Sequence, residues 1–474
     1  MNFSLKMVLK EIDGVIETKR YEVAYKEIST GGPGGYESTY LTSEGDPACD
    51  ELYEILGSFS GKLLPSENRS IRQRNGNPLL NALKEKNSLG IASGFKPSGA
   101  YHFGHTLVSS TVAFFQKNEV QAFMPIADIE ADMDKKLSRE EYLYWVADNL
   151  LDWGASGVNL DATHVYLQSE ERRVNDLAYV VARGLTFDLP VDIYGMKKMI
   201  EDFPFLFAGV TQVGDIILPQ HKAFGNYHSF MVSGQDQDGH AKMTVKLSER
   251  SLENLKNYGI QTIPSAFYIP HIRGIIGKAS SSKPETTIYL GSGPDKNKNE
   301  DLEKRINSSL KKIDNALKNE ELKTNVKLAC LDMVRYIEYF NKYSRLDFKI
   351  ASVNMPQSVK EDIENYIPKE DGDGEPTTLD IYLLDKCENI GQDNVKIVKE
   401  HLEEALTEHQ KKRQEVLNYA IARESHVSTG WDIETSPGQP DFWKVPDKSI
   451  VNPSLRNPTK WFNLVSNMKD KLVP

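Results

Sequence analysis

Between residues 89 and 255, short apolar runs alternate with segments in which apolar residues return at helical spacing. The runs cover residues 89–94, 123–128, 164–167 and 229–234. The helical patterns follow at 105–115, 139–153, 174–184 and after Asp238. Strands that alternate with helices predict an α/β fold with a doubly wound, parallel, Rossmann-like sheet. Ligands of such folds bind beyond the carboxyl ends of the strands. Here those ends carry residues 93–94, 128–130, 168–169 and 234–237.

Helical signals continue into the second half of the chain. The segment 139–153 has Ser138 as a predicted N-cap and Glu141 at the third position of a capping box. Apolar residues also recur at helical spacing from Leu310 onward and again from Val398 to Ala420. The second half is therefore predicted to be mainly helical.

Changes of pattern predict four units, at residues 1–85, 86–292, 293–424 and 425–474. The first is a polar, turn-rich, appended α+β domain that includes a loop-like stretch at 66–78. The second is the Rossmann-like domain, and the third is the helical domain. The fourth is an irregular extension, which we expect to be anchored to the body by Trp431, Trp443 and Trp461.

Charge and cysteine content narrow the function. The 474 residues carry a net charge of −11, so the chain is not built as a general polyanion binder. Residues 295–349 nevertheless hold 13 Lys and Arg against 10 Asp and Glu, a local basic excess. Three scattered cysteines, Cys49, Cys330 and Cys387, predict neither a disulfide framework nor a zinc ribbon. With no apolar run near the ~20 residues of a membrane span, we expect a cytoplasmic protein without membrane contact.

The stretch 97–105, Pro-Ser-Gly-Ala-Tyr-His-Phe-Gly-His, carries the clearest chemistry. It lies between the first strand and its helix, where amide groups and the helix dipole favour a phosphate. His102 and His105 can donate hydrogen bonds to the charge that develops when a phosphate is attacked. Gly104 lets a ligand approach the backbone closely. The plainer alternative is a capped helix with incidental histidines.

A second candidate is the stretch 277–284, Gly-Lys-Ala-Ser-Ser-Ser-Lys-Pro. A mobile loop with Lys278 and three hydroxyls can close over a triphosphate and stabilise a leaving pyrophosphate. Taken alone, the same string is also typical of a solvated serine-rich turn.

Together, the His-x-Gly-His turn and the Lys-x-Ser-x-Ser loop resemble the two-part signature of class I aminoacyl-tRNA synthetases. Within that class the chain is similar to the tryptophanyl/tyrosyl branch, and above all to the archaeal tryptophanyl-tRNA synthetases. The supporting segments are 94–99, 126–131, 167–169 and 234–238. The resemblance covers residues 89–290 in register and continues more loosely to residue 424.

This resemblance implies a tryptophan–tRNA ligase. Tryptophan would attack the α-phosphate of ATP to give tryptophanyl-adenylate and pyrophosphate, and would then pass to tRNA(Trp). The implied catalytic residues are His102, His105 and Lys278. The implied ATP contacts are Gly94, Lys96, His102, Gly104, His105, Gly234, Asp236, Lys278, Ser280, Ser281 and Ser282. Mg²⁺ would arrive with ATP, because no carboxylate pair predicts a metal cage in the protein.

The same resemblance implies a tryptophan pocket. Its expected members are Glu130, Gln168, Gln212, Asp215 and Gln237. An acid at Glu130 can accept a hydrogen bond from the indole N–H, which only donates. The plainer alternatives are a solvated acid for Glu130, helix polarity for Gln212 and Asp215, and a strand-end cap for Gln168.

Three positions depart from the family pattern. Ala279 replaces the methionine of the usual loop motif. Because an apolar residue at this position can have packing of the loop as its sole role, the replacement is compatible with activity. Ala92 stands where tyrosyl enzymes carry a tyrosine, which weakens a tyrosine specificity. Pro125 lies near a position at which relatives carry a polar contact. Other residues must therefore rebuild part of the pocket.

The helical domain is implied to bind the anticodon, with phosphate contacts that position the tRNA and base contacts that specify it. Lys411, Lys412 and Arg413 lie on the predicted polar side of its last helix, either as a tRNA patch or as a solvated face. A homodimer is also implied. Three other functions stay open: a tyrosyl-tRNA synthetase, a paralogue that binds nucleotide or RNA without charging tRNA, and a small-molecule adenylating enzyme.

Overall fold

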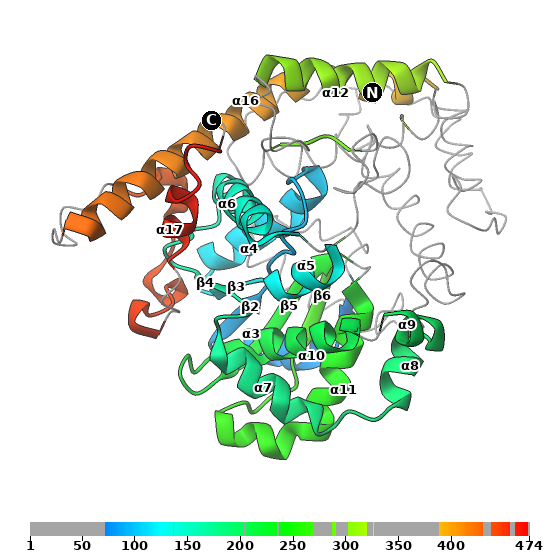
Figure 1. Ribbon diagram of the computed structural model, residues 1–474, viewed down its shortest axis with the longest axis vertical. Coiled ribbons are helices and arrows are strands. Elements are labelled where there is room, and N and C mark those ends of the chain that lie inside the picture. The colour runs from blue at the N-terminus through cyan, green and yellow to red at the C-terminus, as the bar shows by residue number, and fades with distance from the viewer. Residues whose placement is uncertain are drawn as a thin grey trace.

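A mixed sheet forms the centre of the structure. The computed structural model describes residues 72–135, 137–202, 204–234, 237–269, 287–290, 302–319, 326, 388–429, 438–455 and 460–472. In these residues the sheet has six strands in the order β1-β6-β5-β2-β3-β4 (Figure 1). The strands are β1 (Arg72–Arg74), β2 (Leu89–Ala92), β3 (Gln121–Ile126), β4 (His164–Leu167), β5 (His228–Gly234) and β6 (Ser265–Ile269).

The neighbours from β4 to β6 all pair in parallel, so the predicted doubly wound sheet is confirmed. Only β1 is antiparallel, with Gln73 opposite Phe267 of β6. The predicted loop at 66–78 is therefore wrong at its end, because β1 forms there and a helix begins at Gly76. Three polar residues, Arg-Gln-Arg, carry no apolar alternation that could have predicted a strand.

Helices cover both faces of the sheet. The first group is α3 (Gly76–Lys84), α4 (Phe103–Lys117), α5 (Asp128–Lys135), α6 (Arg139–Ala155), α7 (Arg172–Ala182) and α8 (Asp188–Tyr194). The second is α9 (Met196–Glu201), α10 (Pro204–Ile217), α11 (Asp238–Leu255), α12 (Leu302–Leu317), α16 (Glu388–Thr429) and α17 (Trp461–Ser466). The four helices predicted in the first half are confirmed, and Ser138 and Glu141 form the predicted capping box of α6. Of the helices described, none is both long and apolar enough to cross a bilayer.

Alternate residues of the strands belong to two separate hydrophobic clusters. Phe230 and Val232 of β5 pack with α4 and α6, whereas Met231 between them packs with Ile216 of α10 and Ala241 of α11. Figure 1 shows α4, α5 and α6 on one side of the sheet and α7, α10 and α11 on the other. Because successive strand residues point to opposite faces, each buried strand supplies both layers.

The C-terminal segments pack against α6. The indole of Trp443 is buried and donates to the Gly154 carbonyl at 2.9 Å, and that of Trp461 donates to Asp161 at 3.0 Å. Both tryptophans therefore anchor the tail as predicted, while Trp431 lies outside the described residues. Residues of α3, α16 and α17 belong to the same hydrophobic cluster as those of α4 and α6. The division into four units stays a prediction.

Arg413 departs from the prediction of a polar helix face. Lys411 is exposed, but Arg413 is 1% exposed and reaches between two carboxylates of α6. It donates to Asp152 at 2.7 Å and forms an ion pair with Asp148. Neither a tRNA patch nor a solvated face describes a buried guanidinium, so both earlier interpretations are wrong for this residue.

The edge strand β1 is tied to the sheet by a buried ion pair. Arg74 donates to both oxygens of Asp238, at 2.8 and 2.7 Å, and the Tyr268 hydroxyl donates to the same carboxylate at 2.7 Å. Burial alone would lower the pKa of Arg74, but Asp238 outweighs it and raises the pKa. Asp238 begins α11 directly after Gln237, so this pair fixes the start of the helix that follows β5.

Candidate active site

The sheet changes direction next to β2. From β2 the chain adds β3 and β4 on one side, and then β5 and β6 on the other. This switch point lies at the carboxyl ends of β2 and β5, where ligands of such folds bind. Gly94 follows β2 and Gly234 ends β5, so two of the predicted ATP contacts lie there. Ser93 joins the two ends, since its hydroxyl donates to the Val232 carbonyl at 2.8 Å.

Gly94 occupies a position that only glycine can fill. The chain beyond β2 still follows β3, and the Phe95 amide donates to the Pro125 carbonyl at 3.2 Å. A Cβ on Gly94 would lie 1.7 Å from that carbonyl oxygen. Any side chain would therefore push the loop away from β3, together with the histidine turn that follows.

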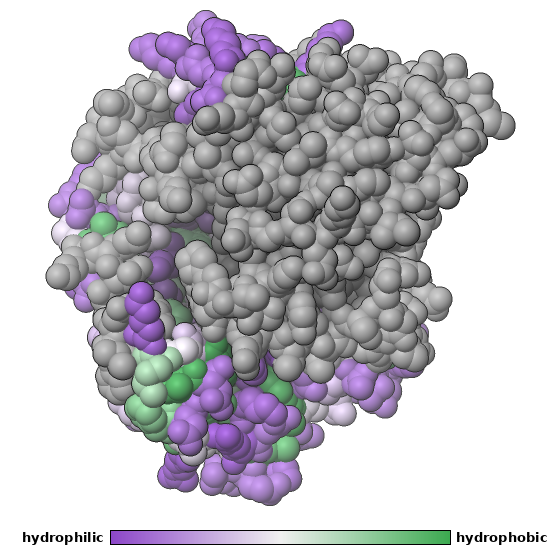
Figure 2. Space-filling model, turned by 90° about the vertical axis from the view of Figure 1, so that its right-hand side faces the viewer, coloured by the Kyte–Doolittle hydropathy of each residue, from purple (hydrophilic) through white to green (hydrophobic). Residues whose placement is uncertain are grey.

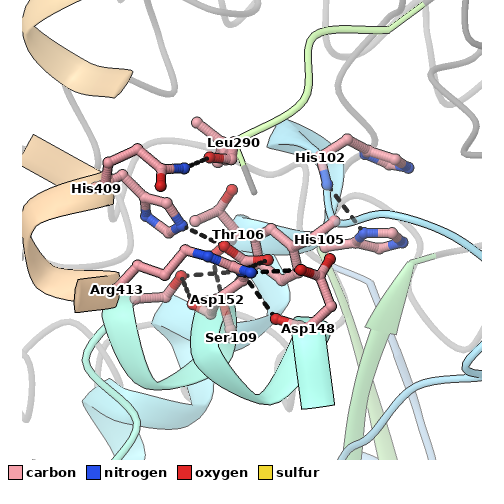
Figure 3. Close-up of polar contacts among 12 residues, drawn as sticks. His102, His105, Thr106, Ser109, Asp148, Asp152, Leu290, His409 and Arg413 are labelled. Carbon is pink, nitrogen blue, oxygen red and sulfur yellow. Dashed lines mark hydrogen bonds and ion pairs between the residues drawn. The ribbon is translucent and has the colours of Figure 1, made fainter. Parts of the chain in front are cut away.

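The two histidines lie stacked at the start of α4 (Figure 3). His102 is the N-cap, and its Nδ1 accepts from the Gly104 amide at 3.0 Å. The Nδ1 of His105 accepts from the His102 amide at 3.3 Å, and the ring centroids are 3.8 Å apart. Because each Nδ1 accepts, a neutral ring carries its proton on Nε2. Two donors of this kind beside a helix N-terminus suit a phosphate.

The absence of a side chain at Gly104 leaves room for the capping ring of His102. A Cβ there would lie 2.9 Å from Cε1 of His102, the ring that caps the helix. The sequence predicted Gly104 as a close approach for the ligand, and the structure adds a steric reason within the turn itself.

The segment Thr287–Leu290 runs beside the histidine turn. The Phe103 amide donates to the Ile288 carbonyl and the Leu290 amide to the Tyr101 carbonyl, each at 3.3 Å. His102 and Tyr289 thereby form an antiparallel bridge. The predicted loop residues Lys278, Ser280, Ser281 and Ser282 lie outside the described residues, as does Asp236.

A second group of polar side chains surrounds Asp215 of α10. Its carboxylate accepts from the Tyr166 hydroxyl at 2.9 Å and from the Gln168 amide at 2.5 Å. Tyr166 lies in β4, and Gln168 follows that strand directly. The structure therefore brings together two predicted tryptophan-site residues, Gln168 and Asp215, and adds Tyr166, which the sequence missed.

Asp215 has an unusual acidity. Burial raises its pKa to about 7, although the hydrogen bonds from Gln168 and Tyr166 favour the charged form. The carboxylates of Asp128 and Glu171 raise it further. Burial and the neighbouring Asp215 also hold the pKa of the Tyr166 phenol well above its usual value. A buried carboxyl with such a pKa near the carboxyl ends of the strands is typical of a functional site.

The remaining predicted residues lie nearer the surface or at helix ends. Lys96 and Glu130 form an ion pair at 3.0 Å, and about a quarter to a third of each side chain is exposed. Gln212 is half-buried on α10, one turn before Asp215. Gln237 is the N-cap residue of α11, beyond the end of β5. Their contacts with a substrate stay a prediction.

One further contact ties two strand ends together. The Ser169 hydroxyl donates to the buried Asp128 carboxylate at 2.5 Å, which links the end of β4 to the first turn of α5. Asp128 and Ser169 lie in the segments 126–131 and 167–169, which resemble the family pattern, so the sequence carried a signal for both residues. Tyr166 gave no such signal, because one tyrosine in a buried strand is ordinary core. Among the described residues, no three His, Cys, Asp or Glu side chains are grouped to hold a metal ion.

Comparison with known proteins identifies the family. Residues 84–370 match the family of class I tRNA synthetases (W and Y). The chain belongs to this family. The matched region encloses the histidine turn, Asp215 and α11, and it begins after β1.

Several relatives are tryptophan–tRNA ligases. The ligase of Methanocaldococcus jannaschii is 32% identical over 225 residues, which cover 45% of this chain and 57% of that protein. The ligase of Methanopyrus kandleri is 33% identical over 217 residues, or 43% and 54% of the two chains. The chain thus matches somewhat more than half the length of these curated relatives.

Solved structures share the synthetase fold. The tryptophanyl-tRNA synthetase of Aeropyrum pernix has a TM-score of 0.53 at 21% identity and covers 85% of this chain and 96% of that one. The tryptophan-bound enzyme of Encephalitozoon cuniculi has a TM-score of 0.53 at 16% identity, with coverages of 82% and 96%. At these identities the likeness shows the fold alone.

The raised pKa of Asp215 predicts how the stability of the protein responds to pH. The folded protein keeps the Asp215 proton up to about pH 7, whereas the unfolded chain releases it near pH 4. Folding therefore takes up a proton in this window, and the contribution of Asp215 to stability falls as the pH rises through it. Asp215→Asn, which cannot titrate, should gain stability over the parent as the pH rises from 4.5 to 8.

Urea midpoints at the two pH values, taken as ~4.5 and ~8 to bracket the window, measure this difference. Asp176→Asn, at an exposed carboxyl of α7, is the control and should show the same gap at both pH values. A pH-independent gap for Asp215→Asn would contradict the raised pKa.

Proposed function

We propose that the protein is a tryptophan–tRNA ligase that makes tryptophanyl-adenylate from tryptophan and ATP and then charges tRNA(Trp). The observation that carries the proposal is the stacked pair His102 and His105 at the switch point, together with the buried carboxylate of Asp215. Family membership and the archaeal ligase relatives support the same substrate.

In the first step, the histidine turn holds the phosphates of ATP. The Nε2–H groups of His102 and His105 donate to the charge that develops as the tryptophan carboxylate attacks the α-phosphate. Gly94 and Gly104 keep the backbone close to the nucleotide. Ile288 and Leu290, which follow the Lys278 loop in the sequence, hydrogen-bond with the backbone of this turn. Mg²⁺ on ATP would balance the phosphate charge.

The tryptophan pocket is proposed around Asp215. Indole offers one N–H donor and no acceptor, so it needs a buried acceptor. We assign this role to Asp215 rather than Glu130, because Asp215 is 1% exposed while Glu130 pairs with Lys96 at a partly open position. Each carboxylate oxygen can accept more than one hydrogen bond, so the bonds from Tyr166 and Gln168 leave capacity for the indole. Gln212 and Gln237 are left for the amino and carboxylate groups.

The helical second half is proposed to hold the tRNA. Lys311 and Lys411 are exposed on α12 and α16 and can contact phosphates. Residues 293–424 would form the anticodon-binding unit after the catalytic unit 86–292, with 1–85 and 425–474 as appended parts. This function places the protein in the cytoplasm.

A homodimer is proposed through an apolar surface. Tyr179 of α7, Phe187 before α8 and Met196 of α9 are 79%, 67% and 47% exposed. Figure 2 shows hydrophobic surface among polar side chains at the end of the molecule where Figure 1 places α8 and α9. Exposed large apolar groups are typical of protein contacts, and a second copy fits the family.

Substrate choice is tested by exchange of labelled pyrophosphate into ATP in the presence of single amino acids. Tryptophan should support exchange, and tyrosine should support it at least ~10²-fold less well, because a pocket that pairs a buried polar group rejects a mismatched partner strongly. Charging of tRNA(Trp) should follow. Exchange with tyrosine alone would assign the sister enzyme, and tryptophan binding without exchange would assign a non-charging paralogue.

His105→Asn should lower kcat of tryptophan-dependent exchange by ~10²–10³, the usual cost of one donor to a developing oxyanion. His105→Gln should lose less, because its amide reaches nearer to the position of Nε2. His221→Asn is the matched control: its Nδ1 also accepts a backbone amide, from Ala223 at 3.1 Å, but it lies at the amino edge of the sheet. Equal losses in all three variants would remove His105 from catalysis.

Tyr179→Glu combined with Phe187→Glu should convert the dimer into a monomer, because each glutamate places a charge in the apolar contact. Sedimentation should give twice the 53.5 kDa chain mass for the parent and the single mass for the variant. Tyr227→Glu, at an aromatic residue that is 41% exposed elsewhere, should stay dimeric. A monomeric parent would refute this surface as the interface.

A further inference from the structure

The ring of His409 on the long helix α16 lies beside the histidine turn. The imidazole of His409 lies nearly parallel to the phenol ring of Tyr101, with 12° between the planes and 6.1 Å between the centroids. Both side chains are buried. Tyr101 directly precedes His102, so α16 reaches the residue from which the turn begins.

The contact extends into a row of four rings. Beyond Tyr101, the ring of His105 lies 5.3 Å away, and that of His102 a further 3.8 Å from His105. The Tyr101 hydroxyl hydrogen-bonds with Ser109 at 2.5 Å and with Ser156 at 3.0 Å. The hydroxyl end of the phenol is thus held by two side chains, while its ring lies beside that of His409.

The ring of His409 is itself held in place by a hydrogen bond to α6 (Figure 3). Its Nε2 donates to Asp152 of α6 at 2.9 Å, and Arg413, one turn further along α16, donates to the same carboxylate at 2.7 Å. Burial alone would raise the pKa of Asp152, but Arg413 and His409 outweigh it and lower that pKa. The imidazole therefore has a fixed orientation before it meets Tyr101.

A second contact comes from the next residue of α16. The Gln410 amide donates to the Leu290 carbonyl at 2.5 Å, and the Leu290 amide donates to the Tyr101 carbonyl at 3.3 Å. Adjacent residues of α16 thus reach Tyr101 on its ring and, through Leu290, on its backbone.

We propose that His409 is a positioning residue for the histidine turn: its ring backs Tyr101 and so sets the orientation of His105 and His102. It touches no substrate itself. The consequence for catalysis rests on the proposed function, whereas the geometric claim does not. Through this contact α16, which precedes the tail and lies far from the ATP signature in sequence, becomes part of the ATP site.

Two substitutions distinguish the effect of the His409 ring from the effect of its hydrogen bond to Asp152. His409→Phe keeps a flat ring against Tyr101 but cannot donate to Asp152. His409→Gln keeps a donor but removes the ring. Tyr419→Phe is the control on the same helix: it removes a hydroxyl that bonds to Asp161 of the catalytic body, far along α16 from Tyr101. Circular dichroism and urea midpoints establish that each variant folds.

The geometry is measured by NMR on the full chain with carbon-13 at histidine Cε1. The ten histidines are assigned with single variants, including His102→Asn and His105→Asn. The His105 resonance should shift in His409→Gln and stay near the parent position in His409→Phe and Tyr419→Phe. A His105 resonance that does not move in His409→Gln overturns the proposal, and so does one that moves equally in Tyr419→Phe.

Kinetics measure the consequence. In tryptophan-dependent exchange, His409→Gln should raise KM for ATP about fivefold, the scale of one aromatic contact, and leave KM for tryptophan unchanged. His409→Phe should restore KM for ATP to within about twofold on the same scale. Equal increases in both KM values would indicate general loosening and overturn the positioning role. A parent protein without exchange refutes the proposed function, while the NMR result still decides the role of His409.

Discussion

The position of β2 between β3 and β5 is the constraint on which the site depends. This strand of four residues is buried along its whole length and pairs in parallel on both sides. Its carboxyl end has no room for a side chain, since Gly94 lies against the Pro125 carbonyl. The chain must therefore leave the sheet in one direction, and that direction delivers the histidine turn to the switch point.

The two parts of the candidate site differ in their electrostatic environment. At the histidine turn, His102 and His105 offer donors beside a helix N-terminus, which suits the negative charge of phosphates. Asp215, in contrast, is buried with two donors and no cation within hydrogen-bond reach among the contacts described, and burial raises its pKa. A site for ATP needs hydrogen-bond donors for the phosphates, whereas a site for the indole N–H needs a buried acceptor. The sheet brings both to its carboxyl edge, because the histidine turn follows β2 and Gln168 follows β4.

The sequence predicted elements whose signals are local. The capping box of α6 and the four-residue strand β4 need only neighbouring residues to be recognised. The sequence did not predict features that depend on a partner residue far along the chain. The strand β1 exists because Arg74 meets Asp238, and Arg413 is buried because α6 offers two carboxylates. Tyr166 acquires a role only through Asp215. Charge and periodicity cannot reveal these pairings, since each member alone resembles an ordinary surface or core residue.

The buried cluster on α6 explains how so long a helix can be placed accurately. Desolvation offsets much of the attraction in a buried ion pair, so Arg413 adds little net stability compared with an apolar residue. An unpaired Asp148 or Asp152 would be costly, however, so the helix is tolerated in one register, with Arg413 between both carboxylates. A register fixed in this way also fixes His409, one turn away, against Tyr101. The cluster thus specifies geometry more than stability, and a charge that the sequence left open as a tRNA contact or a solvated face is used inside the protein instead.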